Sequence, residues 1–243
     1  MTRITATALM GFDDNHGRRR RLTPDEEAML ALVRSSFRDF CRCWRFKNRE
    51  TGEVLTMATL WPGQERFAEL MLSEKRILAL KAGKLGFTEL ECAWDAWVAL
   101  FGQPNARVHL FSKDAPAAQA LLEYVHFGIT HLPWFMQLPI VSKSNDMIRM
   151  HAGPDDLRTI VSYAASPNAA IDQSATHSHV DELARMLFGE QTWQSVQSTI
   201  APGGTCHIVT RGAGDANFVA NLWEQATEGT AYLTPFFAPY TER

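Results

Sequence analysis

The sequence lacks the features that mark membrane, exported and zinc-binding proteins. It has no apolar run of about 18 residues and no signal peptide, which argues against membrane insertion or export. Its 4 cysteines form no zinc pattern, because the single residue between Cys41 and Cys43 is a poor spacing for a shared tetrahedral site. Reduced thiols in a cytoplasm are therefore the preferred interpretation of the cysteines.

The sequence also has fewer basic than acidic residues. The 24 Lys and Arg residues are outnumbered by 27 Asp and Glu residues, so the formal net charge is −3 at pH 7. A plain DNA-binding module would be basic, and this composition argues against one. The only strong basic cluster is the run from Arg18 to Arg21. It could contact DNA or a neighbouring protein, although an exposed, disordered arm is the preferred interpretation.

The apolar pattern predicts a single α/β domain. At 243 residues and 46% apolar, the chain can bury a large core, and it contains no repeat or Ser/Gly linker. Strands are expected at 77–80, 107–111, 158–163, 206–210 and 232–237, and helices at 64–72, 89–100, 114–126 and 217–227. Such alternation predicts a mostly parallel sheet flanked by helices on both faces. An amphipathic N-terminal helix is expected from Thr23 toward Trp44, with Pro24 at its first position.

The most informative segment runs from Lys81 to Thr88 and reads KAGKLGFT. It lies between an expected strand and an expected helix. A strand, a glycine-containing turn and a helix allow backbone N–H groups to converge on a phosphate. Compared with the pattern G-x-x-x-x-G-K-[ST], Gly86 and Thr88 are in register. Lys81, however, replaces the first glycine, and Phe87 replaces the lysine.

We interpret the phosphate-binding lysine as displaced within the loop rather than lost. The chemistry requires one ammonium near the β- and γ-phosphates and one hydroxyl on Mg²⁺, whichever side the ammonium comes from. Lys81 at the start of the loop and Lys84 inside it are the candidates. The alternative is an ordinary turn from strand to helix that carries two surface lysines.

A pair of adjacent acids, Asp181 and Glu182, follows further along the chain. In P-loop ATPases with a catalytic glutamate, a strand ends in such a pair. The Asp binds Mg²⁺ directly or through water, and the Glu polarises the attacking water. The preceding segment, 176–180, contains His177 and His179 and is not the apolar strand expected there. An Asp-Glu pair alone is more often a solvated turn, so the interpretation depends on its order after the loop.

Two further segments with candidate functional residues lie along the chain, one before the phosphate loop and one after the acid pair. Gln64 lies at the start of an expected helix just before the loop, and its amide can both donate to and accept from adenine. Thr210 and Arg211 end an expected strand that would neighbour the phosphate loop and could sense the γ-phosphate.

In this order, the segments resemble the ATPase domain of bacteriophage large terminase subunits, the motors that translocate DNA into procapsids. Some members have a lysine at the first loop position and an aromatic residue at the usual lysine position, as Lys81 and Phe87 are here. The resemblance covers roughly residues 55 to 240. It rests on Trp61-Pro62-Gly63-Gln64, Lys81-Ala82-Gly83-Lys84-Leu85-Gly86-Phe87-Thr88, Val180-Asp181-Glu182-Leu183-Ala184 and Thr210-Arg211-Gly212.

The resemblance implies a P-loop NTPase fold of the ASCE type, with ATP and Mg²⁺ as ligands. Glu182 would be the catalytic acid, with Lys81 and Lys84 on phosphate. Thr88 and Asp181 would bind Mg²⁺, and Thr210 and Arg211 would couple hydrolysis to movement. The nucleotide would be held by Gln64, Lys81, Ala82, Gly83, Lys84, Leu85, Gly86, Phe87 and Thr88.

The implied activity is Mg-ATP hydrolysis that drives double-stranded DNA into a procapsid in the host cytoplasm, without a membrane partner. The implied partners are DNA, the portal protein, the small terminase subunit and further copies in a ring, with a monomer possible in isolation. We divide the chain into an arm and helix (1–50) and the ATPase domain (51–243). A C-terminal nuclease domain is expected to be absent, because the remaining acids show no spacing for a second metal site.

Two alternatives stay open. The chain could be a degenerate P-loop protein that binds nucleotide or DNA without turnover. It could also be a metallohydrolase, because His177, His179 and Asp181 match the start of an H-x-H-x-D-H motif, with His207 as a further ligand.

Overall fold

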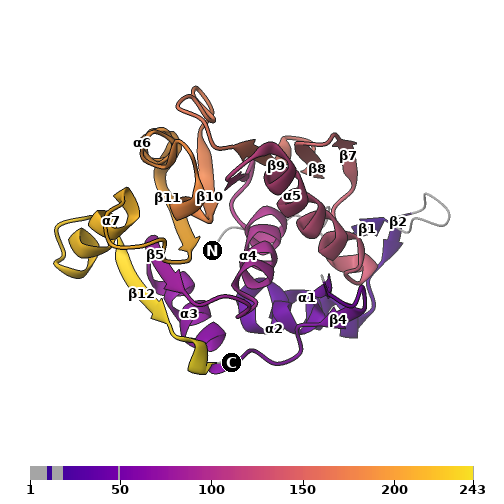
Figure 1. The fold of residues 1–243 in the computed structure, drawn as a ribbon. Coiled ribbons are helices and arrows are strands. Elements are labelled where there is room, and N and C mark those ends of the chain that lie inside the picture. The colour runs from indigo at the N-terminus through magenta and orange to yellow at the C-terminus, as the bar shows by residue number, and fades with distance from the viewer. Residues whose placement is uncertain (1–9, 13–18, 49, 243) are drawn as a thin grey trace.

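The computed structural model describes residues 10–12, 19–48 and 50–242, and its centre is an 8-stranded sheet between helices (Figure 1). The strands lie in the order β12 (Thr234–Ala238), β5 (Arg76–Lys81), β11 (Ile200–Thr210), β10 (Ala175–Asp181), β6 (Arg107–Ser112), β9 (Asp156–Ala164), β8 (Met147–Gly153) and β7 (Ile140–Lys143). Neighbours from β12 to β9 run parallel, whereas β8 and β7 are antiparallel. The predicted α/β fold with a mostly parallel sheet is confirmed, although the β7–β8 hairpin was not predicted.

Helices cover both faces of the sheet. One core cluster joins the sheet to α1 (Pro24–Ser35), α2 (Phe37–Cys43), α3 (Pro62–Ser73), α4 (Phe87–Phe101) and α5 (Ala115–Thr130). A second cluster on the other face contains α6 (Gly189–Thr199) and α7 (Phe218–Thr227). Outside the central sheet, β1 (Met10–Phe12) pairs with β2 (Arg19–Arg21), and β3 (Arg45–Lys47) pairs with β4 (Val54–Thr56). In the described part of the chain, no helix has both the length and the apolar character to cross a bilayer.

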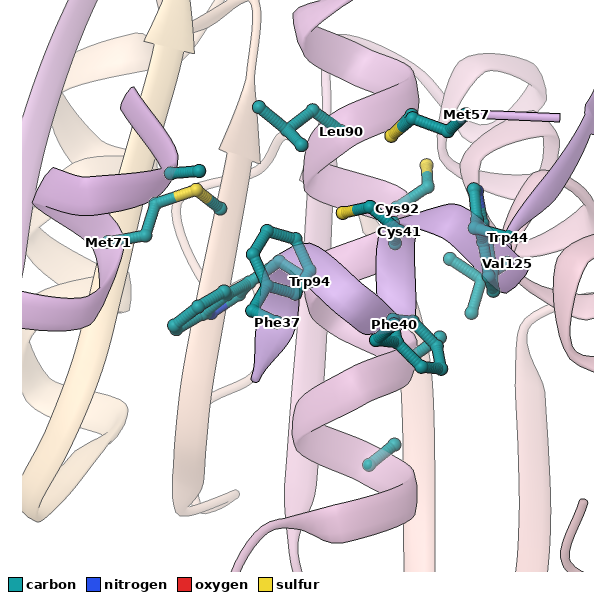
Figure 2. Packing of buried hydrophobic residues seen from close by; sticks show 14 of the residues in the cluster. Phe37, Phe40, Cys41, Trp44, Met57, Met71, Leu90, Cys92, Trp94 and Val125 are labelled. Carbon is teal, nitrogen blue, oxygen red and sulfur yellow. The ribbon is translucent and has the colours of Figure 1, made fainter. Parts of the chain in front are cut away.

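The N-terminal helices are packed on α4 by buried aromatic side chains (Figure 2). The Phe37 ring lies edge-on against Trp94, with 4.9 Å between centroids. Trp44 is 1% exposed and contacts α5 where Gly128 has no side chain. A Cβ atom on Gly128 would lie 2.0 Å from the Trp44 ring, so only glycine allows this approach. Residues 24–44 are thus part of the main core.

The prediction of one continuous N-terminal helix is wrong, because the chain breaks at Ser36. This residue is extended, with φ −135° and ψ 107°, and its hydroxyl accepts a hydrogen bond from the backbone N–H of Asp39. Ser36 therefore ends α1 and caps α2. The buried face of α1 also differs from the predicted one: Leu30 and Val33 are buried, whereas Met29 and Leu32 are 42% and 45% exposed.

The basic run at residues 18–21 differs from its preferred interpretation as a disordered arm. Arg19–Arg21 form β2, which pairs with Met10–Phe12. Arg18 lies outside the described residues, as do 1–9 and 13–17 of the predicted arm.

The polar segment before the acid pair forms a strand after all. It is β10, in the middle of the sheet, where His177 and His179 are 0% exposed. Carboxylates from α4 make this burial possible: Asp95 accepts from His179 Nδ1 at 2.8 Å and lies 3.2 Å from His177 Nε2. Burial opposes the charge on His179, but the Asp95 carboxylate outweighs it and raises the pKa of His179 to about 9.

His109 on β6 predicts a loss of stability in acid. It lies on the opposite sheet face from His177, beside Phe111 and Tyr163, and burial, aided by Arg107 and His177, lowers its pKa from 6.5 to about 4. Above pH 6.5 the His109 imidazole is neutral in both the folded and the unfolded chain. As the pH falls from 6.5 to 4, the unfolded chain binds a proton that the folded chain does not. The free energy of unfolding therefore falls, by about 2 kcal/mol at pH 5.

This contribution can be measured by urea unfolding at pH 7.5 and pH 5 for wild type and His109→Phe. Because Phe does not titrate, we expect the variant to lose about 2 kcal/mol less than wild type over this interval. Equal losses in both proteins would contradict the prediction.

Candidate active site

A cleft of about 590 Å³ opens at the carboxyl ends of β5, β10 and β6 and above the first turn of α4. In open α/β sheets this edge is where ligands bind, and the volume suits a nucleotide. The side chains that bring charge or a hydroxyl to the cleft are Glu50, Lys81, Lys84, Thr88, Glu89, Ser112, Lys113, Tyr124, Asp181, Glu182 and Arg211.

The predicted phosphate loop joins β5 to α4. Lys81 is the last residue of β5, and α4 begins at Phe87 with Gly86 as its N-cap. Gly86 has φ 65°, and a Cβ atom there would lie 2.6 Å from Gln64 Nε2, so the turn requires glycine. The amino end of a 15-residue helix thus faces the cleft, as anion binding requires.

Phe87 occupies the usual lysine position but points into the core. It is 1% exposed and packs against Phe67 and Phe236, with ring centroids 5.1 Å and 6.0 Å away. An ammonium at this position would have to leave water and enter an aromatic cluster. The helix side of this loop therefore provides no phosphate-binding cation.

The two candidate lysines lie in different places. The Lys81 side chain is 7% exposed, and its Nζ is 3.7 Å from Glu182 Oε1. Lys84 is 78% exposed at the rim, where its Nζ pairs with Glu50 at 2.6 Å. The structure therefore brings Lys81, but not Lys84, to the acid pair. An exposed pair such as Lys84–Glu50 contributes little stability.

Thr88 and Asp181 meet at the floor of the cleft. The Thr88 hydroxyl lies 3.5 Å from Asp181 Oδ1, and both side chains line the cleft. Hydroxyl and carboxylate oxygens are ligands that Mg²⁺ prefers, so the two residues fit the predicted metal site.

Glu182 reaches the same cleft because the backbone turns at this residue. Adjacent side chains on a strand point to opposite faces, but β10 ends at Asp181, and Glu182 is left-handed, with φ 58°. Non-glycine residues adopt this conformation at a cost and do so preferentially at functional sites. Glu182 Oε1 accepts a hydrogen bond from Arg211 Nε at 2.9 Å, and Arg185 lies 3.5 Å from the other oxygen.

The end of β11 contacts both the acid pair and the phosphate loop, through Thr210 and Arg211. The buried Thr210 hydroxyl accepts from the backbone N–H of Ala184 at 3.1 Å, which ties the strand to the segment after Glu182. The Arg211 guanidinium is bonded to Glu182 and also passes close to Gly83 of the loop. Because β11 lies between β5 and β10, its end lies between the loop and the acids.

Gln64 has different contacts from those predicted. Its Oε1 accepts from the backbone N–H of Trp61 at 3.0 Å, and its Nε2 donates to the carbonyls of Leu85 and Gly86 at 3.1 Å each. Both ends of the amide are thus engaged with backbone, and the side chain is 7% exposed. In this structure the Gln64 amide bonds to the backbone of the phosphate loop, and its contact with adenine stays a prediction.

Several cleft residues were missed by the sequence interpretation. Ser112 ends β6 and Lys113 follows it, and this strand was predicted, so their place at the same sheet edge could have been inferred. Phe46 and Tyr124 come from the β3–β4 hairpin and from α5, and no sequence signal indicated them.

The metallohydrolase alternative does not agree with this geometry. His177 and His179 are fully buried under α4, whereas Asp181 lies in the cleft with Thr88. The two imidazoles cannot present a metal-bound water to a substrate in the cleft.

Comparison with solved structures identifies the fold. No model of a known protein family matches the sequence. The HK97 bacteriophage large terminase aligns over 90% of this chain and 44% of its own, with a TM-score of 0.62 and 13% identity. An ATPase-domain variant of the Thermus phage P74-26 large terminase aligns over 72% and 80%, with a TM-score of 0.56 and 14% identity.

A third structure, the large terminase of a thermophilic bacteriophage in complex with ADP, aligns over 74% of this chain and 45% of its own, with a TM-score of 0.56 and 10% identity. The chain thus spans less than half the length of the HK97 protein and of this ADP-bound protein. It has the α/β fold of large-terminase ATPase domains, as the alignment with the Thermus phage domain shows.

Proposed function

We propose that this chain is an ATP-hydrolysing motor domain of the large-terminase type, which uses Mg-ATP to translocate double-stranded DNA into a procapsid. The observation that carries the proposal is the convergence of Lys81, Thr88, Asp181, Glu182 and Arg211 on one cleft at the end of the phosphate-loop helix. The shared fold supports it, since the large terminase of the thermophilic bacteriophage also has a structure in complex with ATP-gamma-S.

Each residue would act on the bound nucleotide from its present position. Loop N–H groups and the amino end of α4 would bind the phosphates, with Lys81 near the transferred group. Thr88 and Asp181 would hold Mg²⁺, which supplies charge neutralisation when bound. Glu182 would orient a water in line with the γ-phosphate and accept its proton at a carboxylate oxygen.

The cations around Glu182 suggest how nucleotide binding activates it. Lys81 and Arg211 contact the Glu182 carboxylate, and the γ-phosphate would compete for the same two cations. Their transfer to phosphate would free Glu182 for water. Because Arg211 follows β11 and Thr210 bonds to Ala184, the same exchange would move the coupling segment.

We propose that the adenine base binds against aromatic side chains of the cleft rather than to Gln64. Phe46 and Trp61 line the cleft near the loop, and the Trp61 ring lies 3.8 Å from the position that a Cβ atom on Gly86 would take. Aromatic faces suit a stacked adenine. Gln64 would contribute indirectly, by holding the loop carbonyls.

The packaging partners follow from the same proposal. They are DNA, a portal protein, a small terminase subunit and further copies of the chain in a ring. Within the chain, residues 51–243 would form the ATPase domain, and residues 24–44 pack on it. Lys84 would serve phosphate binding or coupling at the rim. We expect no DNA cleavage by this chain, because the clusters of metal-ligating groups within the described ranges are buried beneath α4.

Calorimetric titration of the chain with ATP-gamma-S and Mg²⁺, followed by a phosphate-release assay with ATP, tests the proposal. We expect micromolar binding and measurable turnover, increased by DNA and by assembly on procapsids. Binding without turnover under any of these conditions would favour the degenerate nucleotide-binding protein instead. Absence of binding would reject both.

A further inference from the structure

Below the cleft, five titratable side chains meet between α4, β10 and β11. They are Glu91 and Asp95 on one face of the helix, His177 and His179 on one face of β10, and His207 on β11, opposite His179 in register. All five are 0% exposed. We call them the buried histidine cluster. None of them has a part in the nucleotide site.

Several polar atoms of the cluster are not satisfied by hydrogen bonds. Within the described ranges, five of its buried atoms make no hydrogen bond of good geometry: Nε2 of His177, His179 and His207, Oε1 of Glu91 and Oδ1 of Asp95. Two of them, His177 Nε2 and Asp95 Oδ1, lie 3.2 Å apart as an ion pair, which leaves three without a polar partner of either kind. Each unpaired polar atom in a protein interior costs free energy comparable to a lost hydrogen bond. Three such atoms beside a buried ion pair indicate a common ligand that satisfies several of these groups together.

The spacing of the ligand atoms suits a metal ion. Ligand atoms of Glu91, His177 and His207 lie within 4.8 Å of one another. His207 Nδ1 is 3.3 Å from Glu91 Oε2, and His177 Nε2 is 3.2 Å from Asp95 Oδ1. Ligand atoms around a tetrahedral zinc lie about 3.3 Å apart, as bond lengths of 2.0–2.1 Å require.

Hydrogen bonds to the cluster also fix the orientation of its side chains. His177 Nδ1 bonds to the Thr205 hydroxyl at 2.7 Å, which turns Nε2 toward the cluster. His179 Nδ1 bonds to Asp95 Oδ2 at 2.8 Å and orients that carboxylate. Metal-binding imidazoles and carboxylates are commonly fixed in this way.

We propose that the buried histidine cluster binds one divalent transition-metal ion of the zinc class through Glu91, His177 and His207, with Asp95 as the adjacent carboxylate. Imidazole and carboxylate ligands suit zinc, whereas Mg²⁺ prefers oxygen ligands and retains waters. The site is closed to the cleft, so the ion is structural. It links the phosphate-loop helix to the strands that end at Asp181 and Thr210.

Metal analysis of the full chain, purified without chelators or added nucleotide, tests this inference. We expect about one zinc-class ion per chain, and at least a tenfold loss of affinity in His207→Gln and in His177→Gln. His109→Gln removes a buried histidine from the other face of the sheet and should retain the ion. Asp181→Asn should also retain it, which separates this site from the nucleotide cleft.

If the histidine variants fail to fold, measurements on the wild-type protein test whether the cluster binds a metal ion. After unfolding in chelator and refolding with Co²⁺, the protein should show the visible absorption of four-coordinate cobalt and a higher Tm than the metal-free protein. A metal-free chain that folds fully, takes up neither Co²⁺ nor Zn²⁺ and shows no change in Tm would overturn the inference. Loss of the ion in Asp181→Asn but not in His207→Gln would overturn it as well.

Discussion

Glu182→Gln is expected to abolish ATP turnover while nucleotide binding stays intact. Gln keeps the shape of the side chain but cannot accept the proton of the attacking water, and such a loss lowers kcat by about 10²–10⁴-fold. Binding of ATP-gamma-S should be equal or tighter, because the Glu182 carboxylate no longer competes with phosphate for Lys81 and Arg211. Phosphate release and calorimetric titration on the same preparations measure the two effects separately.

Arg185→Gln is the matched control for this prediction. Arg185 contacts the same carboxylate at 3.5 Å, but its side chain is 52% exposed and does not line the cleft. We expect turnover close to that of wild type. Glu182→Ala should behave as Glu182→Gln does in turnover. Equal turnover in wild type and both Glu182 variants would reject Glu182 as the catalytic acid.

The extent to which the sequence predicts this molecule depends on whether a feature is local or tertiary. Alternating apolar runs correctly predict the sheet and most of its helices, because burial on both faces imposes that pattern on each segment. The break at Ser36 is an exception among the local features: its hydroxyl caps α2, but the apolar pattern continues past it and predicts one helix. The β10 strand appeared too polar because its partners, Glu91 and Asp95, come from a distant helix.

The site shows the same division between local and tertiary information. The order of Lys81, Asp181 and Thr210 along the chain was sufficient to predict that their strands end near one another, since parallel strands place their carboxyl ends at one edge. The bonding of Gln64 was not predictable, because an amide suits adenine and loop carbonyls equally well. Only the packing of α3 against the loop decides between them.

Lys81→Ala is expected to weaken binding of ATP-gamma-S at least tenfold, or by about 1.4 kcal/mol. Lys81 is the buried cation of the loop, and its ammonium lies beside Glu182. Lys84→Ala should have an effect within about fivefold, because its side chain is 78% exposed and paired at the rim. The reverse order of the two effects would assign the displaced lysine to Lys84.

A lysine at residue 87, the usual position in such loops, should not restore ATP-gamma-S binding to a chain that lacks Lys81. Phe87→Lys replaces a ring that packs on Phe67 and Phe236 with a buried, unpaired ammonium, so we expect the free energy of unfolding to fall by about 3 kcal/mol or more. Chemical denaturation measures this loss, and calorimetry on Lys81→Ala/Phe87→Lys tests for rescue. A stable double variant with wild-type affinity would mean that the loop can receive its ammonium from either side. We expect the opposite, because the side chain at 87 points away from the cleft, and its ring packs with α3 and β12 to fix the start of the helix.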